Sequence, residues 1–263
     1  MTRALTAGRA TGAAILACLA AFAWLTPVLM GADPAQQNLD TALAAPGLAD
    51  PLGSDHLGRS MTARLAAALR LSLGLALLSV ATAAAPGLLL GVLAGWRGGW
   101  VDRALSFLAD SVLAMPGLLL ILLVAALSPG AFWPLYAGVA LVLWVEYFRV
   151  VRAATRTLVL SPQIEASRLL GFGPVYLFRR HIWPELAPVV ATLGAFGAAA
   201  SVLALAALGF VSVGVRPPAA ELGLMMTEYL PYYEEAPWII LSPILCVFLL
   251  VTSLHLMAGR RAP

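Results

Sequence analysis

The segment LVLSPQIEASRLLGFGPVYLFRRHIWP, Leu158–Pro184, is a polar, arginine-bearing island between long apolar runs. Ser161 followed by Pro162 predicts the start of a helix, because a serine oxygen can accept a hydrogen bond from a free backbone N–H and proline needs no donor at the first helical position. Gly171 is expected to end this helix in a left-handed conformation. The island therefore opens with one short helix.

A second short helix is predicted to begin at Gly173 and Pro174. It is expected to end near Trp183, because Pro184 disfavours a helical conformation in the residue before it. Each helix has roughly nine residues, and isolated helices shorter than about 12–15 residues are marginal in water. The pair is therefore interpreted as a docking surface that another protein orders.

The composition places the rest of the chain in a membrane. Of 263 residues, 61% are hydrophobic and 11% charged, with a mean hydropathy of +0.91. A soluble domain would carry about 25% charged residues, so that class is excluded. Uncharged runs predict six spans: one each in 10–32 and 71–96, two between Asp110 and Glu146, and one each within 186–215 and 236–254.

The run between Asp110 and Glu146 is too long for one span of about 20 residues. Ser128-Pro129-Gly130 and Trp133-Pro134 are expected to break it into spans three and four. The even number of spans places both chain ends on the same side of the membrane.

Arginines predict which side that is, because short cytoplasmic loops collect positive charge. With the N-terminus inside, twelve basic residues are cytoplasmic: Arg3, Arg9, Arg97, Arg103, Arg149, Arg152, Arg156, Arg168, Arg179, Arg180, Arg260 and Arg261. Four are external: Arg59, Arg64, Arg70 and Arg216. The island and both termini are therefore predicted to be cytoplasmic. The basic balance reflects topology, with no basic face typical of nucleic-acid binding.

Several kinds of chemistry are excluded by residues that the sequence lacks. It contains no lysine, so it cannot form a P-loop, and it contains no G-x-S-x-G nucleophile motif. His56, His181 and His255 are too dispersed for a metal cluster, and Cys18 and Cys246 lie inside apolar runs. We expect no catalytic residue, metal or cofactor in this chain, and a separate energy source if transport is active.

A stand-alone secondary carrier is the alternative, and it would need ionisable residues within its spans. Asp110 and Glu146 are the candidates, but Glu146 is expected to pair with Arg149 and Asp110 lies within two turns of Arg103. A cleaved signal peptide is the alternative for the N-terminal run, and the retained span is favoured because it is long for a signal.

Two motifs carry a resemblance to a known family. Glu165-Ala166, Gly171 and His181-Ile182-Trp183-Pro184 resemble the EAA loop of bacterial ABC importer permeases, which contacts the ATP-binding subunit. Pro51–Arg59, PLGSDHLGR, resembles the PLGTDxxGRD signature of the C-type permease in the dipeptide, oligopeptide and nickel importer group. Two glycines allow tight turns there, and Asp55 and Arg59 are close enough to pair.

Further matches follow in the order of that family, and some positions depart from it. Segments 94–102, 110–116, 147–153 and 214–218 resemble its AGYxGGWxD, D-x-x-x-x-x-P, Y-x-R-x-x-R-A and G-V-Q-P-P motifs. Leu205 stands where members often have glutamate, Leu222-Gly223 replaces a Trp-Gly pair, and the usual C-terminal tail is replaced by residues 255–261. The departures concern the substrate and leave the architecture unchanged.

The resemblance implies an all-α polytopic membrane protein with six transmembrane helices and the type I ABC importer permease fold. Its parts would be a tail with the first span (1–32), an extracytoplasmic loop or elbow (33–66), a five-helix permease core (67–258) containing the coupling loop 158–184, and a cytoplasmic tail (259–263). The implied location is the bacterial cytoplasmic (inner) membrane.

The resemblance also implies partners and site residues. The partners are a second permease in a heterodimer, two ATP-binding subunits that hold ATP and Mg, and an extracytoplasmic substrate-binding protein. The ATPase-coupling residues would be Glu165, Ala166, Arg168, Gly171, Arg179, Arg180, His181 and Pro184; the extracytoplasmic signature residues would be Gly53, Asp55, Gly58 and Arg59. Small peptides and nickel or metal chelates remain alternative substrates. The acidic outer loop around Glu234 and Glu235 is either an attractor of cations or a solvated cap.

Overall fold

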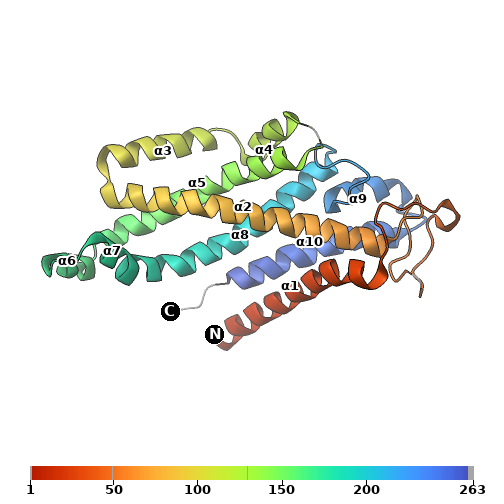
Figure 1. Cartoon of the computed structure of the whole chain (residues 1–263), viewed down its shortest axis with the longest axis horizontal. Helices are drawn as coiled ribbons and strands as arrows, with labels where there is room; N and C mark the ends of the chain where they lie inside the picture. The colour runs from red at the N-terminus through yellow and green to blue at the C-terminus, as the bar shows by residue number, and fades with distance from the viewer. Residues whose placement is uncertain (1, 49, 129, 260–263) are drawn as a thin grey trace.

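The computed structural model describes residues 2–48, 50–128 and 130–259, which form one elongated helical bundle (Figure 1). The elements are α1 Thr2–Met30, η1 Leu39–Thr41, α2 Met61–Arg97, α3 Gly99–Leu113, α4 Gly117–Ala126, α5 Phe132–Val159, α6 Pro162–Leu169, α7 Pro174–Leu177, the π-helical turn η2 Phe178–Ile182, α8 Trp183–Phe210, α9 Leu222–Tyr229, η3 Leu230–Tyr232 and α10 Pro237–Ala258. The described residues include no β-strand, which confirms the all-α prediction.

Five helical segments are long and apolar enough to cross a membrane: Gly8–Met30, Met61–Arg97, Phe132–Val159, Pro174–Phe210 and Pro237–Ala258. A sixth span arises if α3 and α4 are taken together, although the chain bends by 76° between them. The predicted break near residue 128 separates α4 from α5, while Pro129 itself lies outside the described residues. The break expected at Trp133-Pro134 is wrong, because both residues belong to the first turn of α5, where proline removes no intrahelical hydrogen bond.

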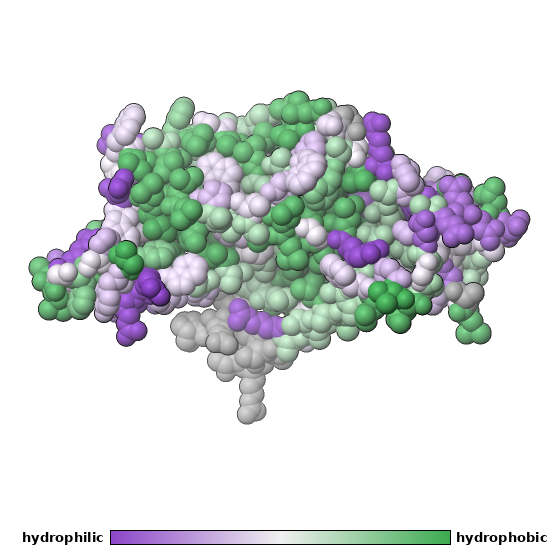
Figure 2. Space-filling model, in the orientation of Figure 1, coloured by the Kyte–Doolittle hydropathy of each residue, from purple (hydrophilic) through white to green (hydrophobic). Residues whose placement is uncertain are grey.

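The two ends of the bundle differ in what they carry. At one end, which we call the α6 end, lie α6 and α7; at the other, the α9 end, lie α9 and the loop 31–60 (Figure 1). The start of α1 and the finish of α10 both point toward the α6 end. Hydrophilic residues gather mainly at the two ends, and apolar residues cover most of the body between them (Figure 2). Arg260 and Arg261, assigned to the tail, lie outside the described residues.

A seam of glycines lets α2 and α5 approach closely. Gly87, Gly91 and Gly95 follow one another at intervals of four residues on α2, so they share one face. A Cβ atom added to Gly91 would lie 2.9 Å from both the Phe148 carbonyl oxygen and the Val151 Cβ atom of α5. Close backbone approach of this kind is how helices associate in lipid, where no hydrophobic effect drives them together.

The second helix of the island does not end at Trp183, so that prediction is wrong. The chain passes from α7 through η2 into α8, and Pro174–Phe210 forms one continuous helical span. In the π-helical turn the Trp183 N–H donates to the Phe178 carbonyl, five residues back. This wider turn accommodates Pro184 at the start of α8 without breaking the helix.

Candidate functional sites at the two ends of the bundle

The α6 helix has the predicted ends, with one difference in its cap. Gly171 has φ +82°, and the N–H groups of Gly171 and Phe172 donate to the carbonyls of Arg168 and Ser167. This is the Schellman arrangement that a left-handed glycine permits. Ser161 is the N-cap residue, but its side chain makes no cap hydrogen bond; its carbonyl accepts instead from the Ile164 N–H at 3.1 Å.

One face of α6 is anchored to the bundle. Ile164 is buried and packs in a cluster with Val151 of α5, Leu177 of α7 and Leu186 of α8. Ser167 Oγ lies 3.0 Å from His181 Nε2, which ties α6 to η2. His181 is thus half-buried and holds the island together from within.

The opposite face of the island is exposed to solvent. Its exposed residues include seven of the eight predicted coupling residues: Glu165, Ala166, Arg168, Gly171, Arg179, Arg180 and Pro184. The structure brings the first four together on α6 and its C-terminal turn, and places the two arginines on η2.

The sequence argument missed an apolar part of this surface. Leu169, Leu170 and Val175 are 85%, 76% and 70% exposed, and Phe172 stacks on Tyr176 with ring centroids 4.2 Å apart. Exposed apolar side chains grouped at a polar tip are typical of a protein interaction site. The sequence did contain a signal for them, because these apolar residues lie beside a short predicted helix and outside every predicted span.

At the α9 end, the signature segment Pro51–Arg59 packs closely against the backbone of the residues that precede it in the same loop. Gly53 and Gly58 have φ +73° and +68°, and a Cβ atom on Gly58 would run into the Asn38 carbonyl. Asp55 Oδ1 accepts from the N–H groups of Leu57 and Arg59, both at 2.9 Å. The predicted pair is confirmed, with Arg59 Nε 2.6 Å from Asp55 Oδ2.

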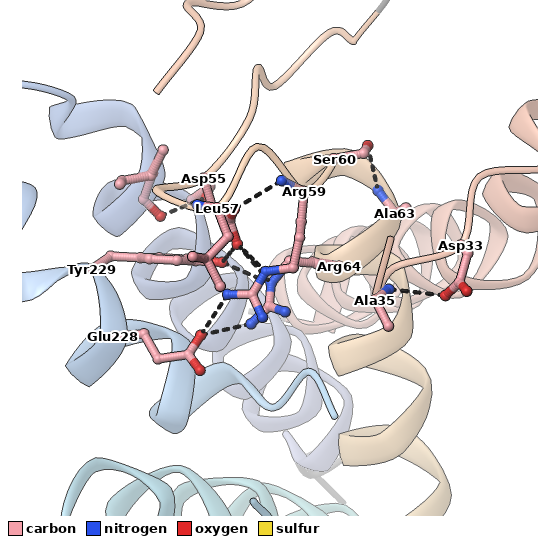
Figure 3. A network of polar contacts seen from close by, with 12 residues as sticks. Asp33, Ala35, Asp55, Leu57, Arg59, Ser60, Ala63, Arg64, Glu228 and Tyr229 are labelled. Atoms are coloured by element: carbon pink, nitrogen blue, oxygen red, sulfur yellow. Dashed lines mark hydrogen bonds and ion pairs between the residues drawn. The ribbon is translucent and has the colours of Figure 1, made fainter. Parts of the chain in front are cut away.

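Three further residues complete this cluster, and the sequence argument missed them. Arg64 donates from Nε to the Tyr229 hydroxyl at 2.8 Å and from Nη2 to Glu228 at 2.6 Å (Figure 3). Asp55 and Arg64 are fully buried, and Arg59 is 2% exposed. We call Asp55, Arg59, Arg64, Glu228 and Tyr229 the outer charge cluster; it joins the loop and α2 to α9.

Helix α2 begins at Met61, within the range predicted as loop 33–66. Arg64 therefore points from a helix into the outer charge cluster, where two arginines face two carboxylates. Balanced, hydrogen-bonded pairing is what allows buried charges to persist. The cluster therefore fixes the loop 31–60 to the bundle.

Burial shifts ionisation equilibria at this end. It lowers the pKa of His56, whose ring stacks on Tyr232 at 5.0 Å between centroids. It raises the pKa of the Tyr229 hydroxyl above its usual range. It also raises the pKa of Glu221, in part offset by the Gly223 and Leu224 N–H groups that this N-cap carboxylate accepts from.

Two ion pairs join motifs that are distant in the sequence. Asp102 of α3 accepts from both Nε and Nη2 of Arg152 on α5. Asp110 accepts from Arg149 Nη2 at 2.8 Å. The prediction that Glu146 pairs with Arg149 is therefore wrong, because Arg149 binds Asp110 of α3. The cation beside Asp110 is Arg149 and not Arg103, which is closer in sequence.

The comparisons with known proteins agree with this architecture. The family described as "Binding-protein-dependent transport system inner membrane component" matches residues 87–263. The chain belongs to this family. It is 34% identical to the Di/tripeptide transport system permease protein DppC of Pseudomonas aeruginosa (strain UCBPP-PA14), over 92% of this chain and 81% of that protein. The Nickel transport system permease protein NikC of Escherichia coli (strain K12) is 32% identical, over 92% and 88% of the two chains.

Among solved structures, the MetNI methionine ABC transporter in an inward-facing form is similar, with a TM-score of 0.53. It is 21% identical and the match covers 68% of this chain and 88% of that one, so it supports the fold alone. The chain is an ABC importer permease of the dipeptide, oligopeptide and nickel group and a multi-pass membrane protein. The alternative of a stand-alone carrier is set aside.

Proposed function

We propose that this permease pairs with a second permease of similar fold and forms the substrate pathway at their shared interface. Two ATP-binding subunits, which would hold ATP and Mg, drive it, and a substrate-binding protein delivers cargo from outside. The supporting observation is the exposed tip of α6, with Glu165, Arg168 and the apolar pair Leu169 and Leu170 facing away from the bundle.

In this proposal the α6 end is cytoplasmic and the α9 end is extracytoplasmic. The bias of arginines supports that orientation, since short cytoplasmic loops are enriched in positive charge. Coupling arises from contacts that differ between two states of the complex, because a conformational change needs a difference in interaction free energy. This chain contributes no catalytic residue, which fits its lack of lysine.

The cargo is proposed to be a small peptide or a nickel or metal-chelate complex, in line with the names of the two relatives, a di/tripeptide and a nickel transport permease. Among residues 2–48, 50–128 and 130–259, no group of three or more histidine, cysteine or carboxylate side chains is placed to hold a bare metal ion. Selection between these cargoes is assigned mainly to the separate binding protein.

The docking proposal is tested by purifying the chain from its native membrane with its partners. The wild type should bring down a second permease and ATP-binding subunits. Glu165→Arg should lose the ATP-binding subunits or uncouple their hydrolysis from transport, because it replaces a negative charge on the exposed docking face by a positive one. Glu235→Arg makes the same change at the α9 end and should retain both subunits and coupling. Recovery of the wild type alone, with ATP-independent transport, would refute the proposal.

A further inference from the structure

A cavity of about 160 Å³ lies between α4, α5 and α8. Its lining includes Gly117 and Ile121 of α4, Val142 of α5, and Ala200 and Ala204 of α8. Every lining residue is apolar or glycine except one, Glu146 of α5. A lone carboxylate in the lining of an apolar cavity requires an explanation, because ionisable residues within a membrane are costly unless they face water or a partner.

Glu146 has no charge partner in the part of the chain that the structure describes. Its nearest arginine in sequence, Arg149, is paired with Asp110, and Arg152 is paired with Asp102. The Glu146 side chain is exposed at the surface of this single chain. Ionisable residues at such positions usually face a water-filled path or a partner of opposite charge.

The net charge of the α9 end indicates the sign of the charge that would bind Glu146. The loop 31–60 and segment 216–235 carry eight carboxylates: Asp33, Asp40, Asp50, Asp55, Glu221, Glu228, Glu234 and Glu235. Four arginines lie in the same half, including Arg70 within α2, which leaves a net charge of −4. A surface of one sign concentrates ions of the opposite sign. Glu146 is the next carboxylate along α5 from this acidic end.

We propose that Glu146 lines the transport pathway and binds the positively charged group of the substrate as it crosses the membrane. This inference rests on the proposed importer function and narrows its cargo to substrates that carry a positive group. The positive group is either the amino group of a peptide or a divalent metal ion. Recognition of positive charge within the membrane is thereby assigned to a residue that immediately precedes the Y-x-R-x-x-R-A motif and is not part of it.

Thiol labelling within the assembled importer tests whether the cavity is a cation-selective path. In a Cys18→Ala, Cys246→Ala background, Ala200→Cys places one thiol in the cavity lining. The rate at which this thiol reacts is measured with two methanethiosulfonate reagents, one carrying a trimethylammonium group and the other a sulfonate group. Glu146→Gln should lower the ratio of cationic to anionic rate about tenfold, because Glu146 and Ala200 line the same cavity and the change removes a negative charge beside the thiol. An unchanged ratio, or a thiol that neither reagent reaches, would overturn the proposal.

Uptake of the cargo provides the second readout. ATP-driven uptake of dialanine and of Ni²⁺ should identify which of these two probes the importer carries. Uptake of that probe should fall about tenfold in Glu146→Gln and recover in Glu146→Asp, and the same probe should protect Ala200→Cys from labelling. Glu235→Gln is the matched control, removing a carboxylate outside the cavity, and should change uptake less than about twofold.

The outcomes separate this inference from the function on which it rests. Wild-type uptake that needs no ATP would refute the importer proposal itself. ATP-driven uptake that is equal in wild type and Glu146→Gln would refute only the role of Glu146. Loss of the second permease from purified Glu146→Gln complexes would also overturn it, because Glu146 would then pair with that subunit.

Discussion

At the scale of single residues, the structure of the α9 end depends on charged side chains that are buried. The spacing of Asp55 and Arg59 predicted their pairing, because both belong to one short loop. Arg64, Glu228 and Tyr229 were not predictable in the same way, since Glu228 and Arg64 are 164 residues apart in sequence. Only the packing of α9 against α2 brings these side chains together.

Replacing Arg64 by methionine should strongly destabilise the protein. The substitution leaves Asp55 and Glu228 with only Arg59 as a cation, and removing one partner of a buried ion pair costs about 3–5 kcal/mol. Thermal unfolding of purified complexes measures the effect. Arg216→Met alters an exposed arginine at the same end and should shift the midpoint little. Equal midpoints for the two variants would contradict the role assigned to the outer charge cluster.

Acid should weaken the α9 end through His56. Because burial lowers its folded-state pKa below the ordinary value of 6.5, the unfolded chain binds more protons as pH falls through that value, and stability decreases. His56→Phe keeps an aromatic ring against Tyr232 and cannot titrate. We expect the unfolding temperature of wild type to fall more steeply than that of the variant between about pH 6.5 and 5. Parallel curves would refute this expectation.

At the scale of elements, glycines set how closely α2 and α5 can approach. A π-helical turn before Pro184 lets the helix continue through that proline. The rule that the residue before proline leaves the helix predicted a stop at Trp183. It failed because the π-helical turn supplies a different hydrogen-bond pattern at that point. The apolar runs predicted where long helices lie, but they carried no signal for the α2–α5 seam or the 76° bend.

Two glycines of α2 provide a matched test of the seam. Gly91→Ala should destabilise the bundle by about 1–3 kcal/mol, because the added methyl group overpacks the contact with Phe148 and Val151. Gly74→Ala adds the same group where nothing lies within 4 Å, so it should be neutral or slightly stabilising through helix propensity. Denaturation of the two variants in the same detergent measures the difference, and similar losses would exclude the seam as the cause.

At the scale of the whole molecule, the distribution of arginines predicts which end faces the cytoplasm. Uncharged runs predicted six spans; the structure has five as single long helices in the part of the chain that it describes, and the sixth depends on joining α3 to α4. The family motifs located both candidate sites, since their residues are contiguous in sequence. The cavity beside Glu146 was not foreseen, because its third wall comes from α8, which is distant in sequence from α4 and α5.

Labelling of intact cells tests the proposed orientation. In the cysteine-free background, Leu48→Cys should react with a membrane-impermeant maleimide, because Leu48 is fully exposed at the α9 end. Leu160→Cys, 79% exposed near the α6 end, should react only after the membrane is permeabilised. The reverse pattern would place the coupling loop outside and rule out its docking to ATP-binding subunits.

The continuity of α7, η2 and α8 has a mechanical consequence. The 37 residues from Pro174 to Phe210 form a lever about 55 Å long, and a tilt of about 5° would displace its far end by about 5 Å. A flexible linker would not transmit a movement of Arg179 and Arg180 to the rest of the chain. A continuous helix does transmit it, and this helix contributes Ala200 and Ala204 to the cavity wall. Under the proposed function, movement of a partner bound at the α6 end would therefore be transmitted along this helix to the cavity wall.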